Sequence, residues 1–216
     1  MATTIYATND GRVVNFETTN WTDTRDATSG NTASVVANLN DMCQVSKVAG
    51  GRGGGTTYGC ARGFFQFDTT SITHVPKAAN IMIYGYSTSG AGTMYGVKST
   101  QSGSLAASDF DAIDGWQTGG VDNISNVTIY TDLVGGSWDT SDYNRFTLTQ
   151  QALVDIAGMT TFKIAVCNFA NDIRAIEPST ATNRSGCHTS AYVGTTRDPS
   201  LIITEQDNSV FFGCNF

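Results

Sequence analysis

Charged residues are scarce in this sequence. Asp, Glu, Lys and Arg make up 14% of the 216 residues, and the formal net charge is −7. The few cations stand singly and form no basic stripe. Because a nucleic-acid-binding surface needs clustered cations to neutralise phosphates, neither a nucleic acid nor an anionic membrane surface is an expected partner.

Long apolar runs are also missing. No apolar segment approaches the roughly 20 residues that a membrane-spanning helix needs, so no membrane span is expected. The first residues, MATTIYATNDGRVV, contain no basic region followed by an apolar one, and this pattern does not predict a signal peptide.

Catalytic motifs are equally hard to find. The two histidines, His74 and His188, stand in no recognisable catalytic motif. The segment Gly85–Ser89 resembles a nucleophile elbow but lacks its closing glycine. Five aspartates could in principle pair as the acid and base of a glycosidase, but all lie in predicted polar turns: Asp109, Asp111, Asp114, Asp139 and Asp142. We therefore expect no enzyme activity and no catalytic residue.

The cysteine pattern argues against zinc. There are five cysteines, an odd number, and no pair has C-x-x-C spacing: Cys43, Cys60, Cys167, Cys187 and Cys214. We expect reduced thiols, with a Cys43–Cys60 disulfide as the alternative.

We expect no cofactor and no metal site. A loop calcium site is the alternative, built from Asp109 and Asp111 or from Asp23, Asp26 and Asn31. The acidic pair Asp109 and Asp111 resembles the start of an EF-hand loop, but the EF-hand register fails at Ile113.

Glycine, threonine, serine and aromatic residues are abundant, and they are arranged as short strands separated by turns. Turn signals recur about every 8–12 residues, which is typical of a sandwich or a jelly roll. We predict an all-β fold: a single jelly-roll β-sandwich with one short helix over Gln150–Ala157. Strands are predicted over residues 12–17, 33–38, 43–48, 62–68, 80–87, 93–99, 127–131, 145–149, 162–168, 187–193 and 200–204.

Two of these strands carry specific expectations. The stretch RGFFQFDTTSITHV places Phe64, Phe65 and Phe67 in a core strand, and Asp68 then ends it in a turn by accepting backbone hydrogen bonds. The segment NIMIYGYS is apolar on both faces, so we expect Asn80–Ser87 to be a central strand covered on both sides.

Several aromatic residues are candidates for contacts with other molecules. Trp116, Trp138 and Tyr143 lie in or beside predicted loops and could stack on glycan rings, although loop tryptophans can equally cap the ends of a sandwich. The apolar ends of the chain are candidates for docking or oligomer contacts: Met1–Ile5 at the start, and Val210, Phe211, Phe212 and Phe216 at the end.

Five segments occur in an order that points to a family. They are RGFFQFDTTSI, AANIMIYGY, SLAASDFDAI, SWDTSDYNRFTLTQQALVDIAGMTTFKIAV and DPSLIIT. Over about residues 55–205 the chain resembles the jelly-roll module of bacteriophage virion proteins, which is related to DNRLRE-type and carbohydrate-binding-module sandwiches.

The resemblance implies a non-enzymatic virion protein: a capsid decoration protein or a head or tail fibre component. Its partners would be other copies of itself and other virion proteins such as the major capsid protein, and its location would be the virion. The alternative is a glycan-binding module that attaches to a host or polysaccharide surface. The implied organisation is one domain over 1–216, with N-terminal strands and a docking arm over 1–50, a jelly-roll core over 55–205 and an apolar tail over 206–216.

Overall fold

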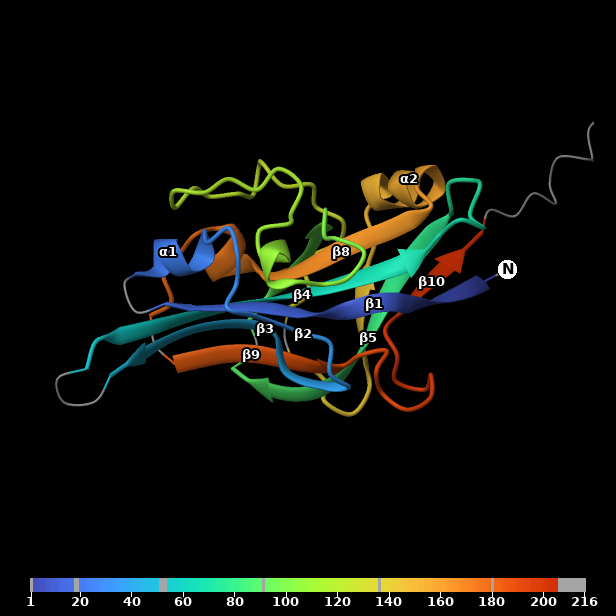
Figure 1. Cartoon of the computed structure of the whole chain (residues 1–216). Helices are drawn as coiled ribbons and strands as arrows, with labels where there is room; N and C mark the ends of the chain where they lie inside the picture. The colour runs from blue at the N-terminus through green and yellow to red at the C-terminus, as the bar shows by residue number, and fades with distance from the viewer. Residues whose placement is uncertain are drawn as a thin grey trace, which may run out of the picture.

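The chain folds into an all-β sandwich, as predicted (Figure 1). The computed structural model describes residues 2–17, 20–50, 54–90, 92–135, 137–179 and 181–205. Within these ranges the strands are β1 Ala2–Glu17, β2 Thr32–Ser34, β3 Asn38–Ala49, β4 Thr56–Asp68, β5 Ala78–Ser89, β6 Met94–Lys98, β7 Tyr143–Thr147, β8 Thr161–Asn168, β9 Ala181–His188 and β10 Ser200–Thr204. The helices are α1 Trp21–Arg25, α2 Gln150–Gly158, the 3₁₀ turn η1 Ala107–Asp109 and the π-helical turn η2 Phe169–Ile173.

Two antiparallel sheets share two of these strands. One sheet has the order β1-β10-β5-β7. In the other, β4 pairs with β1 along one edge and with β3 and β8 along the other, and β9, β6 and β2 extend it. The strands β1 and β5 pass from one sheet into the other, and their registers shift at Ala7/Asn9 and at Gly85/Ser87. Such bulges bend a strand, which lets it turn the corner of a sandwich.

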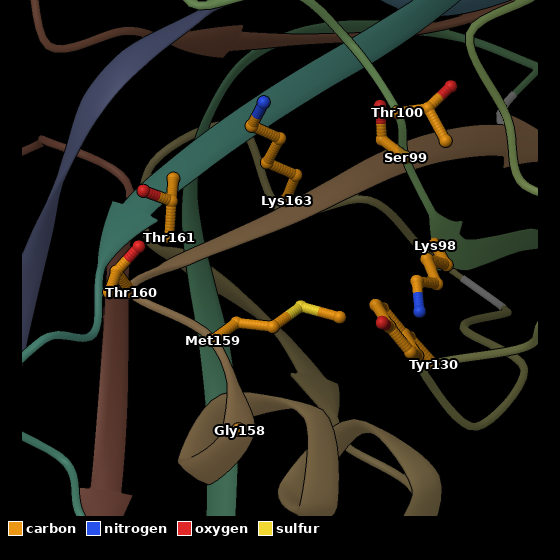
Figure 2. Close-up of a pocket in the computed structure, with 9 residues that line it drawn as sticks. All are labelled: Lys98, Ser99, Thr100, Tyr130, Gly158, Met159, Thr160, Thr161 and Lys163. Carbon is orange, nitrogen blue, oxygen red and sulfur yellow. The ribbon is translucent and has the colours of Figure 1, made fainter.

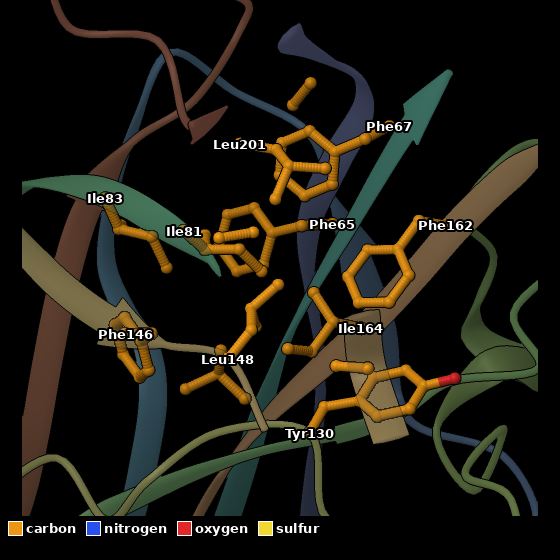
Figure 3. Packing of buried hydrophobic residues seen from close by; sticks show 14 of the residues in the cluster. Phe65, Phe67, Ile81, Ile83, Tyr130, Phe146, Leu148, Phe162, Ile164 and Leu201 are labelled. Atoms are coloured by element: carbon orange, nitrogen blue, oxygen red, sulfur yellow. The ribbon is translucent and has the colours of Figure 1, made fainter. Parts of the chain in front are cut away.

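The main core fills the space between the two sheets. Phe65 and Phe67 of β4 meet Ile81 of β5, Phe146 of β7 and Leu201 of β10, as Figure 3 shows. These five side chains are essentially inaccessible to solvent. Because side chains alternate across a strand, Phe64 points away from this core.

The opposite face of β4 is covered as well. Phe64 packs with Trp21 of α1 and with Phe110 and Ile113 from the loops between β6 and β7. In Figure 1, α1 and these loops lie on the same side of β4 and β8. The core-strand prediction for Phe64, Phe65 and Phe67 is therefore confirmed, and β4 is buried on both faces.

The strand β5 is central as predicted, because it pairs with both β10 and β7, but the prediction that both of its faces are covered is wrong. Ile81 and Ile83 are buried, but Met82 and Tyr84 are only half-buried and Tyr86 is 41% exposed. The apolar residues on its outer face belong to an aromatic surface rather than to a second core.

Local signals placed some boundaries correctly. Asp68 Oδ1 accepts a hydrogen bond from the Thr70 backbone N–H, so the predicted turn after β4 is confirmed. The helix predicted over Gln150–Ala157 is α2, where Thr149 caps the first turn by accepting from the Ala152 N–H. Its buried residues include Leu153 and Ile156, which face the core.

Other boundaries differ from the predictions. The polar segment after β1 contains the short helix α1, whose first turn is capped by the Asn20 side chain. The strand predicted over 187–193 ends at His188, where β9 gives way to a turn. The segment 127–131 contributes only isolated bridges at Ile129 and Thr131. Finally, Ala2–Ile5, expected as a docking arm, forms the start of β1 and pairs with β10.

None of the helices in the described ranges has the length and apolarity needed to cross a bilayer.

Candidate ligand-binding groove

An open groove of about 480 Å³ lies where β6, β8 and the C-terminal end of α2 meet (Figure 2). It was not predicted from the sequence. The residues that line it are Lys98, Ser99, Thr100, Tyr130, Gly158, Met159, Thr160, Thr161 and Lys163.

The alternation of β8 explains why polar side chains reach this groove. Phe162 and Ile164 face the core between the sheets, so Thr161 and Lys163 project from the opposite face of the strand. Lys98 ends β6, which pairs with β8 in antiparallel register and places Lys98 opposite Ile164. Directly paired residues share a face of an antiparallel sheet, so Lys98 leaves the sheet on the face of Ile164 and Lys163 leaves it on the other face. Both lysines line the groove, which lies beyond the end of β6.

Lys98 carries a compensated charge. Its Nζ donates to Asp155 Oδ2 over 3.0 Å, and the Tyr130 hydroxyl donates to the same oxygen. Partial burial opposes ionisation of Asp155, but hydrogen bonds from Tyr130, Lys98 and Gln151 outweigh it and lower the pKa of Asp155. The aspartate therefore stays ionised and neutralises Lys98 at neutral pH.

Lys163 carries a charge without such compensation. Its Nζ donates to the Gln101 carbonyl over 2.7 Å, and it makes no ion pair with any carboxylate in the described ranges. An ammonium group has three donors, so donors remain for a ligand.

Three threonine hydroxyls complete the polar lining. Those of Thr100, Thr160 and Thr161 have no hydrogen-bond partner within the part of the chain that the structure describes. The Ser99 hydroxyl differs, because it is buried and bonded to the Ala112 carbonyl. The groove thus offers one uncompensated positive charge and three free hydroxyls, which suits a polar, anionic molecule.

The structure does not bring the predicted glycan contacts together. Trp138 is only 6% exposed; its Nε1 donates to the Gly186 carbonyl over 2.9 Å, and its ring packs edge-on to Phe146. It belongs to the core between the sheets, whereas Trp116 packs on the other side of β4. Tyr143 is half-buried, and its hydroxyl donates to the Thr196 carbonyl over 3.1 Å.

The predicted docking residues Val210, Phe211, Phe212 and Phe216 lie outside the described residues. The same holds for Met1 and for Cys214.

Four cysteines are free and buried in the described ranges, and the alternative Cys43–Cys60 disulfide is not formed there: Cys43, Cys60, Cys167 and Cys187. Burial raises the pKa of each of these thiols. A buried thiol with a raised pKa is a poor nucleophile and a poor metal ligand.

Two of the side chains considered for calcium, those of Asp109 and Asp26, have other partners. Asp109 accepts hydrogen bonds from the Ser102 and Ala106 backbones, and Asp26 pairs with Arg25. Across the described ranges, no three His, Cys, Asp or Glu side chains are grouped so that they could hold a metal ion.

A buried ion-pair cluster was also missed in the sequence. Arg62 and Asp172 are fully buried and share two hydrogen bonds of 2.9 and 2.7 Å. The Arg62 guanidinium stacks between the rings of Phe110 and Trp116, 4.3 and 4.1 Å from their centroids. The contacts of Arg62 hold the loops that carry these two rings against β4. Because Arg62 and Asp172 are fully buried, a ligand has no access to them.

An aromatic cluster surrounds His188, the last residue of β9. The rings of Tyr84, Tyr86 and Tyr192 contact the imidazole edge-on, with centroids 4.7 to 5.5 Å away. Burial, and then the charge of Arg197, lower the pKa of His188, so the imidazole is neutral at neutral pH. The other histidine, His74, is exposed, and its Nδ1 lies 2.9 Å from the Thr73 hydroxyl, with which it shares a hydrogen bond.

The sequence matches no protein-family model, and no curated protein matches it significantly.

Proposed function

We propose that this chain is a non-enzymatic structural protein of a virion, either a capsid decoration protein or a component of a head or tail fibre. The observation that carries the proposal is the spatial arrangement of the segments that resemble the virion family. AANIMIYGY lies in β5, SWDTSDYNRFTLT leads into and contains β7, and DPSLIIT contains β10. The strand β5 pairs with β10 on one edge and with β7 on the other.

Of the two remaining resembling segments, SLAASDFDAI supplies Phe110 and Ile113 to the opposite face of β4, and RGFFQFDTTSI packs on this sheet. RGFFQFDTTSI supplies Phe65 and Phe67, which contact the β5, β7 and β10 side chains across the core. Segments that are far apart in the sequence therefore pack together. This supports the interpretation that the chain resembles the virion module as a whole, and not only in short sequence matches that arose by chance.

Three of the five candidate aspartates, Asp139, Asp109 and Asp114, have hydrogen bonds that support a role without catalysis. Hydrogen bonds from the Ser141 backbone N–H and hydroxyl lower the pKa of Asp139, so this carboxyl stays ionised, whereas a general acid needs a raised pKa. Asp109 accepts three hydrogen bonds that shape its own turn, and Asp114 accepts one from the Thr128 hydroxyl.

The proposal is tested on particles from the biological source of the chain. Mass spectrometry of gradient-purified particles should detect the chain at a fixed ratio to the major capsid protein, and immunogold electron microscopy should label the particle surface or fibres. Removing residues 210–216 should lower its incorporation into particles. Particles that contain none of the chain at any stage of purification would refute a virion role.

A second candidate function is attachment to surface glycans. The groove between β6, β8 and α2 favours it, because its volume and free hydroxyls suit a small polar ligand. The tryptophans first considered do not favour it, since Trp138 lies in the core. A glycan array probed with the purified chain tests this function, and an array without any signal would count against it.

A further inference from the structure

We infer that the groove binds a saccharide that carries one carboxylate, and that Lys163 is the residue that contacts this carboxylate. The inference rests on the proposed attachment to glycans and specifies its ligand class. It is independent of where the chain is located.

The first argument is charge. The sequence has only four lysines and a net charge of −7, yet two lysines line this groove. Asp155 neutralises Lys98, whereas the only hydrogen-bond acceptor of Lys163 in the described ranges is the neutral Gln101 carbonyl. The groove therefore presents one net positive charge, which matches a ligand with one negative charge.

The second argument is the placement of that charge. Figure 2 shows Lys163 and Gly158 on opposite sides of the groove. Gly158 ends α2, and the C-terminal end of a helix carries a partial negative charge. An anionic group would be repelled at this end, so the ligand's carboxylate is expected at the Lys163 side.

The third argument is the set of neutral groups. The hydroxyls of Thr100, Thr160 and Thr161 can each donate and accept, as sugar hydroxyls do. Met159 lies between Thr160 and Thr161 on one side of the groove and Tyr130 on the other, and it gives an apolar surface for the C–H face of a ring (Figure 2). A volume of about 480 Å³ lies within the range of small-molecule sites, so one to a few sugar rings fit.

Titration calorimetry with the full chain tests the inference. The probes are a galactose trimer in which one unit is replaced by galacturonic acid, called here the acidic trimer, and a trimer of galactose, so the two differ by one carboxylate. We expect the acidic trimer to bind at least 10-fold more tightly in 20 mM salt, and this preference to shrink in 500 mM salt because salt screens exposed charges.

Three variants locate the site. Lys163→Met should weaken binding of the acidic trimer at least 10-fold, and Lys163→Arg should restore most of it. Lys77→Met removes the same charge from an exposed lysine outside the groove, and it should change the affinity less than 2-fold. Thr100→Val changes an exposed groove residue and should weaken both trimers, which keeps the test valid if Lys163→Met fails to fold.

The outcomes distinguish a failure of the acidic-saccharide inference from a failure of glycan attachment. If both trimers bind equally and Lys163→Met has no effect, the acidic ligand class is wrong while glycan attachment stands. If neither trimer binds at millimolar concentration and a glycan array is also empty, both the inference and glycan attachment are wrong. The virion proposal survives either result, since particle composition tests it separately.

Discussion

Replacing Asp172 with asparagine tests what holds α1 and the loops before β7 against the outer face of β4. Asp172 is fully buried in η2, and its two carboxylate oxygens accept from Arg62 Nε over 2.9 Å and from Nη2 over 2.7 Å. Asparagine has nearly the same shape but only one acceptor oxygen. Its amide group would point two donors at a guanidinium that has no acceptor.

The expected cost follows from the burial of the cation. Arg62 is fully buried between two aromatic rings, so its charge cannot reach water when the carboxylate is lost. Breaking a buried ion pair by removing one partner costs about 3–5 kcal/mol. Since domains are typically stable by about 5–15 kcal/mol, Asp172→Asn should remove a large part of the free energy of unfolding.

The measurement is equilibrium unfolding in urea followed by tryptophan fluorescence. The midpoint should fall while the slope stays constant, because the area exposed on unfolding does not change. The matched control is Asp122→Asn, which changes an ion pair with Arg174 whose side chains are 41% and 43% exposed. An exposed pair contributes at most about 1 kcal/mol, so the control should unfold almost like the parent chain.

A third variant separates the buried charge from simple loss of contacts. The double variant Arg62→Met/Asp172→Asn removes the cation as well, so it should be less destabilised than the sum of the two single variants. The reasoning fails if Asp172→Asn costs less than about 1 kcal/mol, or if the double variant shows full additivity.

Two further predictions concern the main core and the pH dependence of stability. Phe65→Ala or Phe67→Ala should each lower the free energy of unfolding by about 3–5 kcal/mol, because each leaves a cavity among fully buried side chains; near-neutral urea midpoints would contradict this packing. Burial raises the pKa of Asp10 from 3.8 to about 6 despite its hydrogen bonds from Ser190. Because the folded pKa exceeds the unfolded one, the contribution of Asp10 to stability is full below pH about 4 and is lost as the pH rises through 6, by up to about 3 kcal/mol. Between pH 4 and pH 7 the melting temperature should fall less steeply for Asp10→Asn than for the parent chain. Equal slopes for the two proteins would mean that a group other than Asp10 causes the pH dependence.

Local patterns were enough to predict part of the fold. The alternation of Phe162, Ile164 and Val166 predicted a strand, and the 3.6-residue spacing of Leu153 and Ile156 predicted α2. The side-chain oxygen of Asp68 predicted the turn after β4. These features depend on residues that are close in the sequence, so the information needed to predict them is contained in a short segment.

The candidate site could not be predicted in the same way. Lys163 stands in FKIAVCN as a lone charge in an apolar strand, and this was the only local signal for the groove. Nothing in the sequence indicates that Lys98 lines the same groove, because the pairing of β6 with β8, which places Lys98 opposite Ile164, is a long-range contact. In the same way, Trp138 looked like a loop aromatic until the structure placed it in the core.

By itself, the sequence determined that the chain forms short antiparallel strands around a large aromatic core, since alternation, turn residues and composition act locally. Only the tertiary structure decided which faces are covered. It buried β4 on both sides and left the outer face of β5 partly open, although both strands are apolar on both faces. The physical reason is that burial of a strand's second face depends on which distant segments pack on it, and α1 and the loops before β7 pack on β4.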